Sequence, residues 1–255
     1  MTMMPAITFE TKCYENDYRI LLNTSRLRQV IDRCQTPFAK KMIFLNNIND
    51  MERAKAYADQ RVREGVIDAY QVVAEKADEA LRFFSIDPET FHGGYYYSIA
   101  ELVSIYLCET PYLLHFSSDA ILERVDGSWI ESAIAVMEKN PQVVVANPVW
   151  NGKYEEAKAE SFSEDALFYY SHGFSDQCYL INTRCFKAAI YNAQHPMSDR
   201  YPAHGGDSFE KRVDSYLRTH QLLRITHKTA NYLHRNFPST WPKKPYYYWT
   251  HKLFS

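Results

Sequence analysis

The first 150 residues alternate between strand-like and helix-like patterns of hydrophobic positions. Segment 6–13 carries apolar residues at every second position, whereas segment 17–34 places Ile20, Leu27 and Ile31 at helical spacing. The alternation continues with expected strands at 41–45, 69–74, 112–116 and 143–146 and expected helices at 51–62, 98–107 and 128–140. Repeated strand–helix steps predict an α/β fold with a mixed, mainly parallel central sheet and helices on both faces.

The pattern is less regular beyond these segments. Residues 75–97 are ambiguous, and the polar segment 151–171 is expected to be an insertion or a mobile connection, because the apolar pattern resumes directly after it. The later expected elements are a strand at 178–181, helices at 184–193 and 208–220 and a strand at 222–226. No repeat divides the chain, and we expect a single domain over residues 1–255 whose ligands bind beyond the carboxyl ends of the strands.

Composition excludes several classes of partner and compartment. The 255-residue chain is 46 % hydrophobic and 15 % aromatic, and its 29 basic and 31 acidic residues leave no basic field for a nucleic acid polymer. Five cysteines without a C-x-x-C pair argue against a disulfide framework and a structural zinc site, which indicates a reducing compartment. No signal peptide or transmembrane segment is visible, so we expect a cytoplasmic protein, with peripheral membrane association left open.

Missing motifs exclude several enzyme classes. The chain has no P-loop, no G-x-G-x-x-G, no G-x-S-x-G and no H-E-x-x-H. Kinase, Rossmann dehydrogenase, α/β-hydrolase and histidine-based zinc hydrolase are therefore unsupported as interpretations. Two aromatic runs, Tyr95–Tyr97 and Tyr246–Trp249, can stack on sugars or bases, lie at a membrane surface or pack against the fold.

Two side chains are candidate metal ligands. Asp119 follows the expected strand 112–116, so its carboxylate can reach a metal ion or a ribose hydroxyl at the edge of the sheet, or cap the next turn. His234 follows the last expected strand, where a neutral imidazole can ligate a divalent ion or form an ordinary polar contact.

A third candidate, Asp207, follows two glycines at the start of the expected helix 208–220. Gly205 and Gly206 permit a tight turn, and Asp207 beside it can serve as a general base toward a substrate hydroxyl. The alternative is structural, because Asp207 and Glu210 also form a pair of the capping-box type.

The order of these loops resembles the GT-A class of nucleotide-sugar glycosyltransferases, in particular the inverting family 2, over about residues 7–234. The resemblance implies a Rossmann-like GT-A fold in which 1–120 bind the nucleotide sugar, 121–234 carry the acceptor and catalytic half, and 235–255 form a C-terminal tail. It also implies transfer of a sugar, with inversion, from a UDP- or GDP-sugar to a hydroxyl of a glycan or lipid-linked acceptor in polysaccharide biosynthesis.

The resemblance assigns the donor site by position. Thr11, Tyr14 and Glu15 lie in a segment similar to the nucleotide-contacting first loop of the family, and Asn46 stands where an acid commonly reads the base. The run Ser117-Ser118-Asp119 is similar to the D-x-D motif with serine at the first acid, which implies nucleotide-sugar contacts for Ser118 and Asp119 and metal ligation by Asp119. Glu101 stands near the place of a frequent arginine, so another residue must offset the diphosphate charge.

The resemblance assigns the acceptor side in the same way. Asp176 and Gly206 are implied acceptor contacts, Asp207 matches the catalytic base of the E-D motif, and His234 matches a metal-binding histidine that would hold Mn²⁺ or Mg²⁺ with Asp119. Three alternatives stay open, namely a nucleotidyltransferase, a retaining transferase of the same fold, and a non-catalytic nucleotide- or glycan-binding module.

Overall fold

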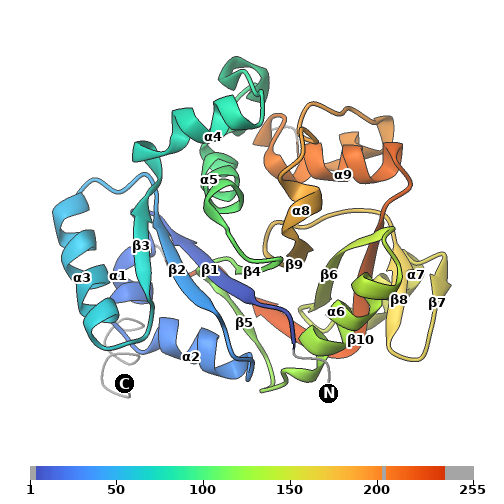
Figure 1. Cartoon of the computed structure of the whole chain (residues 1–255), viewed down its shortest axis with the longest axis horizontal. Helices are drawn as coiled ribbons and strands as arrows, with labels where there is room; N and C mark the ends of the chain where they lie inside the picture. The colour runs from blue at the N-terminus through green and yellow to red at the C-terminus, as the bar shows by residue number, and fades with distance from the viewer. Residues whose placement is uncertain (1–3, 203–204, 239–255) are drawn as a thin grey trace.

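The computed structural model describes residues 4–202 and 205–238, and the strands of this part of the chain form one ten-stranded sheet (Figure 1). The strands are β1 (Ile7–Cys13), β2 (Lys40–Leu45), β3 (Ala69–Val72), β4 (Tyr112–Phe116), β5 (Ala120–Leu122), β6 (Val143–Trp150), β7 (Ser163–Glu164), β8 (Phe168–Ser171), β9 (Cys178–Asn182) and β10 (Leu223–His234). Their order is β3–β2–β1–β4–β9–β6–β10–β8–β7, and β5 pairs with β10. Strands β1 to β4 pair in parallel, as do β6 and β10, whereas β9 runs antiparallel to β4 and β6.

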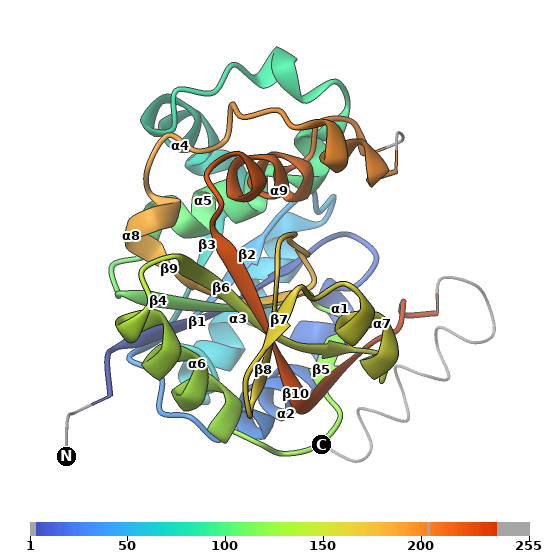
Figure 2. The ribbon, with the colours of Figure 1, turned by 90° about the vertical axis from the view of Figure 1, so that its right-hand side faces the viewer.

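Helices cover both faces of this sheet. They are α1 (Tyr18–Leu22), α2 (Arg26–Arg33), α3 (Met51–Arg63), α4 (Ala77–Phe83), α5 (Ile99–Leu107), α6 (Ser128–Lys139), α7 (Tyr154–Ala159), α8 (Thr183–Phe186) and α9 (Phe209–Thr219). One apolar cluster joins α1, α2, α3 and α6 to the sheet, and a second joins α4, α5, α8 and α9 to the opposite face (Figure 2). The predicted α/β fold with a mainly parallel sheet between helices is confirmed.

The first predicted helix, 17–34, is two helices. The hydroxyl of Thr24 donates to the carbonyl of Ile20 at 2.6 Å and accepts the N–H of Arg26 at 3.1 Å. These bonds compete with the helical pattern, because a threonine side chain offers the backbone an alternative partner. The helix therefore stops at Leu22 and restarts at Arg26.

The second half departs further from the predicted boundaries. β6 and β10 extend well beyond the apolar segments that predicted them, and the polar segment 151–171 contributes α7, β7 and β8 at one end of the sheet. The ambiguous segment 75–97 holds α4 and short 3-10 turns, and the helix expected at 184–193 is only the short α8. The predicted helix 128–140 is α6, and Asp126 accepts the backbone N–H of Ser128, its first residue, at 2.9 Å.

Two other expectations concern the chain's surroundings and its end. Among the residues the structure describes, no helix is both long enough and apolar enough to span a bilayer. Most of the expected C-terminal tail, including the aromatic run Tyr246–Trp249, lies outside the described residues.

Candidate functional site

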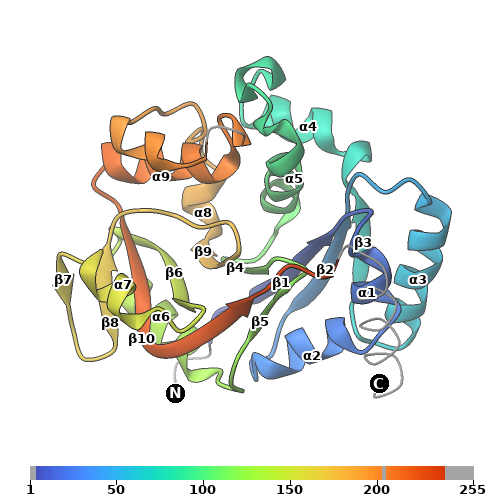
Figure 3. The ribbon, with the colours of Figure 1, turned by 180° about the vertical axis from the view of Figure 1, so that it is seen from behind.

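Asp119 and His234 lie side by side at the carboxyl end of β4. Ala120 of β5 pairs antiparallel with His234 of β10, so the residue before β5 reaches the end of β10 (Figure 3). Nε2 of His234 is 3.2 Å from Oδ1 of Asp119, and the hydroxyl of Ser117 donates to the same oxygen at 3.2 Å. Asn151 holds His234 by accepting its backbone N–H at 2.8 Å and donating to its carbonyl at 3.2 Å. The two predicted metal ligands are therefore brought together.

The Asp119 carboxylate of this pair suits a divalent cation, whereas His234 can bind one only as the neutral imidazole. Burial acts to raise the pKa of Asp119, but hydrogen bonds from His234 and Ser117 outweigh it, and the pKa lies below its usual value. The hydrogen bond to Asp119 raises the pKa of His234. Donors 3.2 Å apart fit neighbouring positions around one ion, since two bonds of about 2.1 Å at a right angle separate their donors by about 3 Å. The described residues contain no cluster of three His, Cys, Asp or Glu side chains that could hold a metal ion.

A further carboxylate, Asp17, faces the same edge. The hydroxyl of Ser118 donates to one oxygen of Asp17, and the backbone N–H of Tyr14 donates to the other at 2.5 Å. Burial raises the pKa of Asp17 to about 7 despite these bonds. The sequence analysis missed Asp17. Its position at the end of the first loop, directly before an apolar helix, could have identified it as a candidate.

An aromatic surface lies beside the loop after β1. The ring of Tyr14 stacks on that of Tyr96 with centroids 5.5 Å apart, and Tyr96 and Tyr97 remain 44 % and 46 % exposed. Asn46 is only 4 % exposed, and a hydrogen bond from its side chain to Tyr14 acts against the burial that raises the pKa of the Tyr14 phenol. An amide and a phenol therefore lie side by side at the base of the aromatic surface.

The other two predicted first-loop contacts are engaged in the fold. Thr11 lies inside the sheet between Ile43 of β2 and Phe116 of β4 and is 1 % exposed. Glu15 accepts the backbone N–H of Asn49 at 2.8 Å, which ties the loop after β1 to the loop before α3. The structure therefore brings Tyr14, Asn46, Ser118 and Asp119 to one edge, with Thr11 beneath it.

A buried ion pair lies behind this edge. The ammonium of Lys12 on β1 pairs with the carboxylate of Glu101 on α5, and both residues are more than nine-tenths buried. Burial lowers the pKa of Lys12, although the carboxylates of Asp176 and Asp119 act in the opposite direction. Glu101, which stands where the resembling family often has an arginine, thus holds a cation close to the Asp119 edge.

Asp176 links this edge to α9. Its charge acts on Lys12 and His234, and it also acts on Glu210 in the first turn of α9. Glu210 accepts the backbone N–H of Asp176, and burial, followed by the charge of Asp176, raises the pKa of Glu210 well above its usual range. Glu210 also lines a cavity of about 430 Å³ together with Gln177 and Tyr232.

Asp207 points elsewhere. The N-cap of α9 is Ser208, whose hydroxyl accepts the backbone N–H of Lys211, so Asp207 precedes the cap and Glu210 lies inside the helix. The carboxylate of Asp207 lies 2.9 Å from Nζ of Lys211 and 3.9 Å from Nε2 of His92, and it lines a different cavity. The acid of α9 that the structure brings to Asp176 is Glu210.

Backbone atoms pack closely around Gly206. Gly206 has φ +56°, and a Cβ there would lie 2.4 Å from the carbonyl oxygen of Phe91 and 2.5 Å from that of His92. The N–H of Asp207 donates to the same Phe91 carbonyl at 2.8 Å. The glycine therefore serves close packing of the segment 205–207 on the loop 91–94.

Replacing Gly206 by alanine is expected to lower the free energy of unfolding by about 2–4 kcal/mol, because the left-handed φ and the clash with two carbonyl oxygens add. Urea unfolding followed by circular dichroism measures it. Gly205→Ala is the matched control, since a Cβ at Gly205 meets no atom within 4 Å and its φ is not in the left-handed region. Equal stability of the two variants would contradict the close packing.

Comparisons with known proteins bear on the fold. The sequence matches no protein-family model and has no significant match among curated protein sequences. A solved structure described as GalNAc-T7 with UDP, GalNAc and Mn²⁺ matches with a TM-score of 0.54 at 10 % identity over 92 % of this chain and 44 % of that chain. CMP:2-keto-3-deoxy-manno-octonic acid synthetase with CTP matches with a TM-score of 0.48 at 10 % identity over 98 % of both chains. Glucosyl-3-phosphoglycerate synthase from Mycobacterium tuberculosis, with Mn²⁺, UDP and glucosyl-3-phosphoglycerate, matches at 0.45 and 9 % identity over 92 % and 73 %.

These structural matches concern the fold. The chain has the GT-A type of α/β fold that the resemblance implied. It spans less than half the length of the GalNAc-T7 chain. At such low identity the likeness shows the fold alone, so the activity must be argued from the site.

Proposed function

We propose that this protein transfers a sugar from a nucleoside diphosphate sugar to an acceptor hydroxyl. The observation that carries the proposal is the pair of Asp119 and His234, 3.2 Å apart at the carboxyl edge of the sheet. Ligands of open α/β sheets bind at such an edge, and a carboxylate beside an imidazole suits Mn²⁺ or Mg²⁺. Bound there, the ion would offset negative charge on the leaving diphosphate.

The donor nucleotide would lie over the loop after β1. Its base would stack on the aromatic surface of Tyr14 and Tyr96, and the Asn46 amide beside Tyr14 would donate to a base carbonyl. Lys12 is paired with Glu101 in the interior, so the metal ion would offset most of the diphosphate charge. The carbonyls of uracil, thymine, cytosine and guanine all fit an amide donor, and we propose UDP because the matched structure described as GalNAc-T7 contains UDP with Mn²⁺.

The transfer step needs a base on the acceptor side. As the acceptor oxygen bonds to the anomeric carbon, the bond from that carbon to the diphosphate oxygen breaks, its electron pair leaves with the diphosphate, and Glu210 takes the hydroxyl proton. Glu210 is preferred to Asp207 because its carboxylate lies beside Asp176 and because a raised pKa makes it a stronger proton acceptor. It also lines the cavity that contains Gln177 and Tyr232, here called the acceptor cavity. A base and a leaving group on opposite sides of the sugar imply inversion.

The acceptor cavity also suits a glycan. Trp150 on its wall is 39 % exposed, and the ammonium of Lys153 lies 4.4 Å from the centre of its ring. Arg224, on the same wall, donates to the hydroxyl of Ser171 at 2.9 Å and to Glu160 at 3.0 Å. An aromatic face with fixed polar groups around it binds sugar rings and their hydroxyls, and we propose a glycan or a lipid-linked glycan as the acceptor.

The test is calorimetric titration of the protein with UDP, GDP, CDP and dTDP, each with and without Mn²⁺. UDP is expected to bind most tightly and to need the metal, because the diphosphate completes the ligand shell of Asp119 and His234. Asn46→Ala should weaken UDP binding about tenfold, since it removes the donor to the base, whereas Asn49→Ala on the exposed neighbouring loop should not. Absence of binding to all four nucleotides would overturn the transferase proposal.

A further inference from the structure

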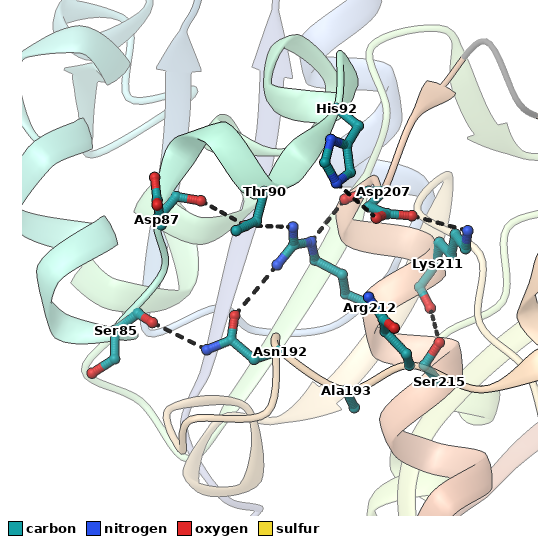
Figure 4. Close-up of a pocket in the computed structure, with 11 residues that line it drawn as sticks. Ser85, Asp87, Thr90, His92, Asn192, Ala193, Asp207, Lys211, Arg212 and Ser215 are labelled. Carbon is teal, nitrogen blue, oxygen red and sulfur yellow. Dashed lines mark hydrogen bonds and ion pairs between the residues drawn. The ribbon is translucent and has the colours of Figure 1, made fainter.

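Asp207 belongs to a second cavity that the proposed function leaves without a role. This cavity, here called the α9 cavity, has a volume of about 430 Å³ and is formed by the segment 85–92, the segment 192–194 and α9 (Figure 4). Asp207 and Lys211, one helical turn apart, face it, whereas Glu210 lines the acceptor cavity. The two cavities therefore share one short helix as a common wall.

The wall of the α9 cavity is held rigidly by Arg212. Its guanidinium donates to the carbonyl of Tyr191, the hydroxyl of Thr90 and the carbonyl of Asp207, each at 2.8 Å, and it lies 4.3 Å from the centre of the Phe91 ring. Arg212 is only 6 % exposed, so three chain segments are joined by a buried group. The polar atoms of the cavity are thus fixed before any ligand arrives, which lowers the entropy lost on binding.

The remaining polar atoms form a mixed set of donors and acceptors. The side chain of Asn192 donates to the carbonyl of Ser85 at 3.0 Å, and its oxygen stays on the cavity side within 3.5 Å of Arg212. The carboxylate of Asp207 is held between Lys211 and His92, and Figure 4 shows these groups converging at the same end of the cavity. Oriented carboxylate, amide and ammonium groups are what a ring with several hydroxyls requires, since each hydroxyl both donates and accepts.

The charges of the α9 cavity favour a neutral ligand. The carboxylates of Asp87 and Asp207 balance the cations of Lys211 and Arg212, and Asp199 outside the cavity adds a second acid 3.1 Å from Lys211. A phosphate or carboxylate ligand would have to displace one of these acids or lie against it. A neutral polyol meets no such penalty.

We propose that the α9 cavity binds a neutral pyranose unit of the acceptor glycan, separate from the unit whose hydroxyl reacts. That the sugar is part of an acceptor rests on the proposed function, whereas binding of the sugar in this cavity does not. Asp207 and Asn192 would accept and donate hydrogen bonds to ring hydroxyls, and a glycan passing along α9 would have one unit in each cavity.

The test is saturation-transfer NMR with the methyl glycosides of glucose, galactose, mannose and N-acetylglucosamine, without nucleotide or metal. At least one glycoside is expected to bind the wild-type protein. Asp207→Asn and Asn192→Ala should each weaken that binding about 10- to 100-fold, because each removes oriented hydrogen bonds and Asp207 also carries charge. Having two variants keeps the test valid if one of them fails to fold, which circular dichroism reports.

The matched control is Asp199→Asn, which removes the other carboxylate that pairs with Lys211 but does not line the cavity. Sugar binding should survive in Asp199→Asn. Equal loss in this control, absence of binding by every glycoside, or stronger binding of glucuronate and inorganic phosphate than of the neutral glycosides would overturn the proposal. Because no nucleotide is present, these results are independent of the calorimetric test of the transferase.

Discussion

Replacing Glu210 by glutamine is expected to lower kcat by about 10²–10⁴ while UDP affinity stays within a few-fold, which is the usual contribution of a general base. The amide keeps the shape of the side chain but cannot take a proton from the acceptor hydroxyl, or from water when the donor is hydrolysed. Release of UDP from a UDP-sugar in the presence of Mn²⁺ measures the rate, and calorimetry measures the affinity. Glu131→Gln, an exposed carboxylate on α6 at the opposite face of the sheet, is the matched control.

The rate of transfer should depend on the ionisation of Glu210. Glu210 must be ionised to act, and burial and then Asp176 raise its pKa, so the rate should fall as pH drops through a value well above the ordinary 4.5 of a glutamate. The raised pKa also makes ionised Glu210 a cost to folding, so its contribution to stability decreases as pH rises above 4.5 toward that value. In Glu210→Gln both effects should disappear.

Three outcomes contradict this assignment. A loss of about 10²–10⁴ in Asp207→Asn, together with a nearly normal rate in Glu210→Gln, would return the role of base to Asp207. A product that retains the anomeric configuration of the donor would indicate a retaining transferase, which needs no base at Glu210. A protein that binds UDP and Mn²⁺ but never releases UDP from any UDP-sugar would be a binding module.

The predicted base is Asp207, whereas the contacts of Glu210 lead us to propose Glu210, and sequence patterns alone do not distinguish the two acids. The helix 208–220 and the acids near its start were predictable, because apolar positions repeat at helical spacing. Which acid faces the sheet depends on where the helix begins, and a start at Phe209, with Ser208 as the cap, turns Glu210 toward Asp176 and leaves Asp207 outside. The position of the cap decides whether Asp207 belongs to the helix, and sequence patterns leave such a boundary open by one or two residues.

The pair of Asp119 and His234 was predicted for a different reason than the contacts that bring the two side chains together. Asp119 and His234 were chosen from the end of one strand and a likeness near the end of the chain. Their contact depends on β5, a three-residue strand that has no periodic signal, and on the extension of β10 to His234. Such pairing is set by tertiary context, so strands this short are not recognised from local pattern. Asn151 was missed because it orients His234 only through the folded backbone.

Removing either side chain of the metal pair should abolish most of the metal-dependent affinity. In Asp119→Asn or His234→Ala, UDP binding in Mn²⁺ is expected to weaken by about 10²-fold or more, since loss of a partner that merely orients a ligand already costs about 10–100-fold. Without Mn²⁺ the variants and the wild type should bind UDP almost equally. His220→Ala, an exposed histidine beyond the end of α9, is the control, and an unchanged Mn²⁺ effect in both site variants would place the ion elsewhere.

The pH dependence of that affinity follows from the same contact. The Asp119 hydrogen bond raises the pKa of His234 above 6.5, and metal ligation requires the neutral imidazole, so Mn²⁺ affinity should increase with pH through the range above 6.5. In the metal-free protein, the stabilisation of the fold by this ion pair has the opposite dependence and decreases as pH rises. The pair stabilises the fold fully below pH 6.5, where unfolded histidine is also protonated, and this contribution is lost as pH rises through the raised pKa of His234. At the acid end the stabilisation by the pair is lost as pH falls from 3.8 through the lowered pKa of Asp119.

Thermal unfolding at several pH values, with and without Mn²⁺, tests both effects. Stabilisation of the fold by the bound ion should increase with pH, while stabilisation by the Asp119–His234 ion pair decreases. A stabilisation by Mn²⁺ that does not change between pH 5.5 and 8.5 would mean that His234 does not ligate it.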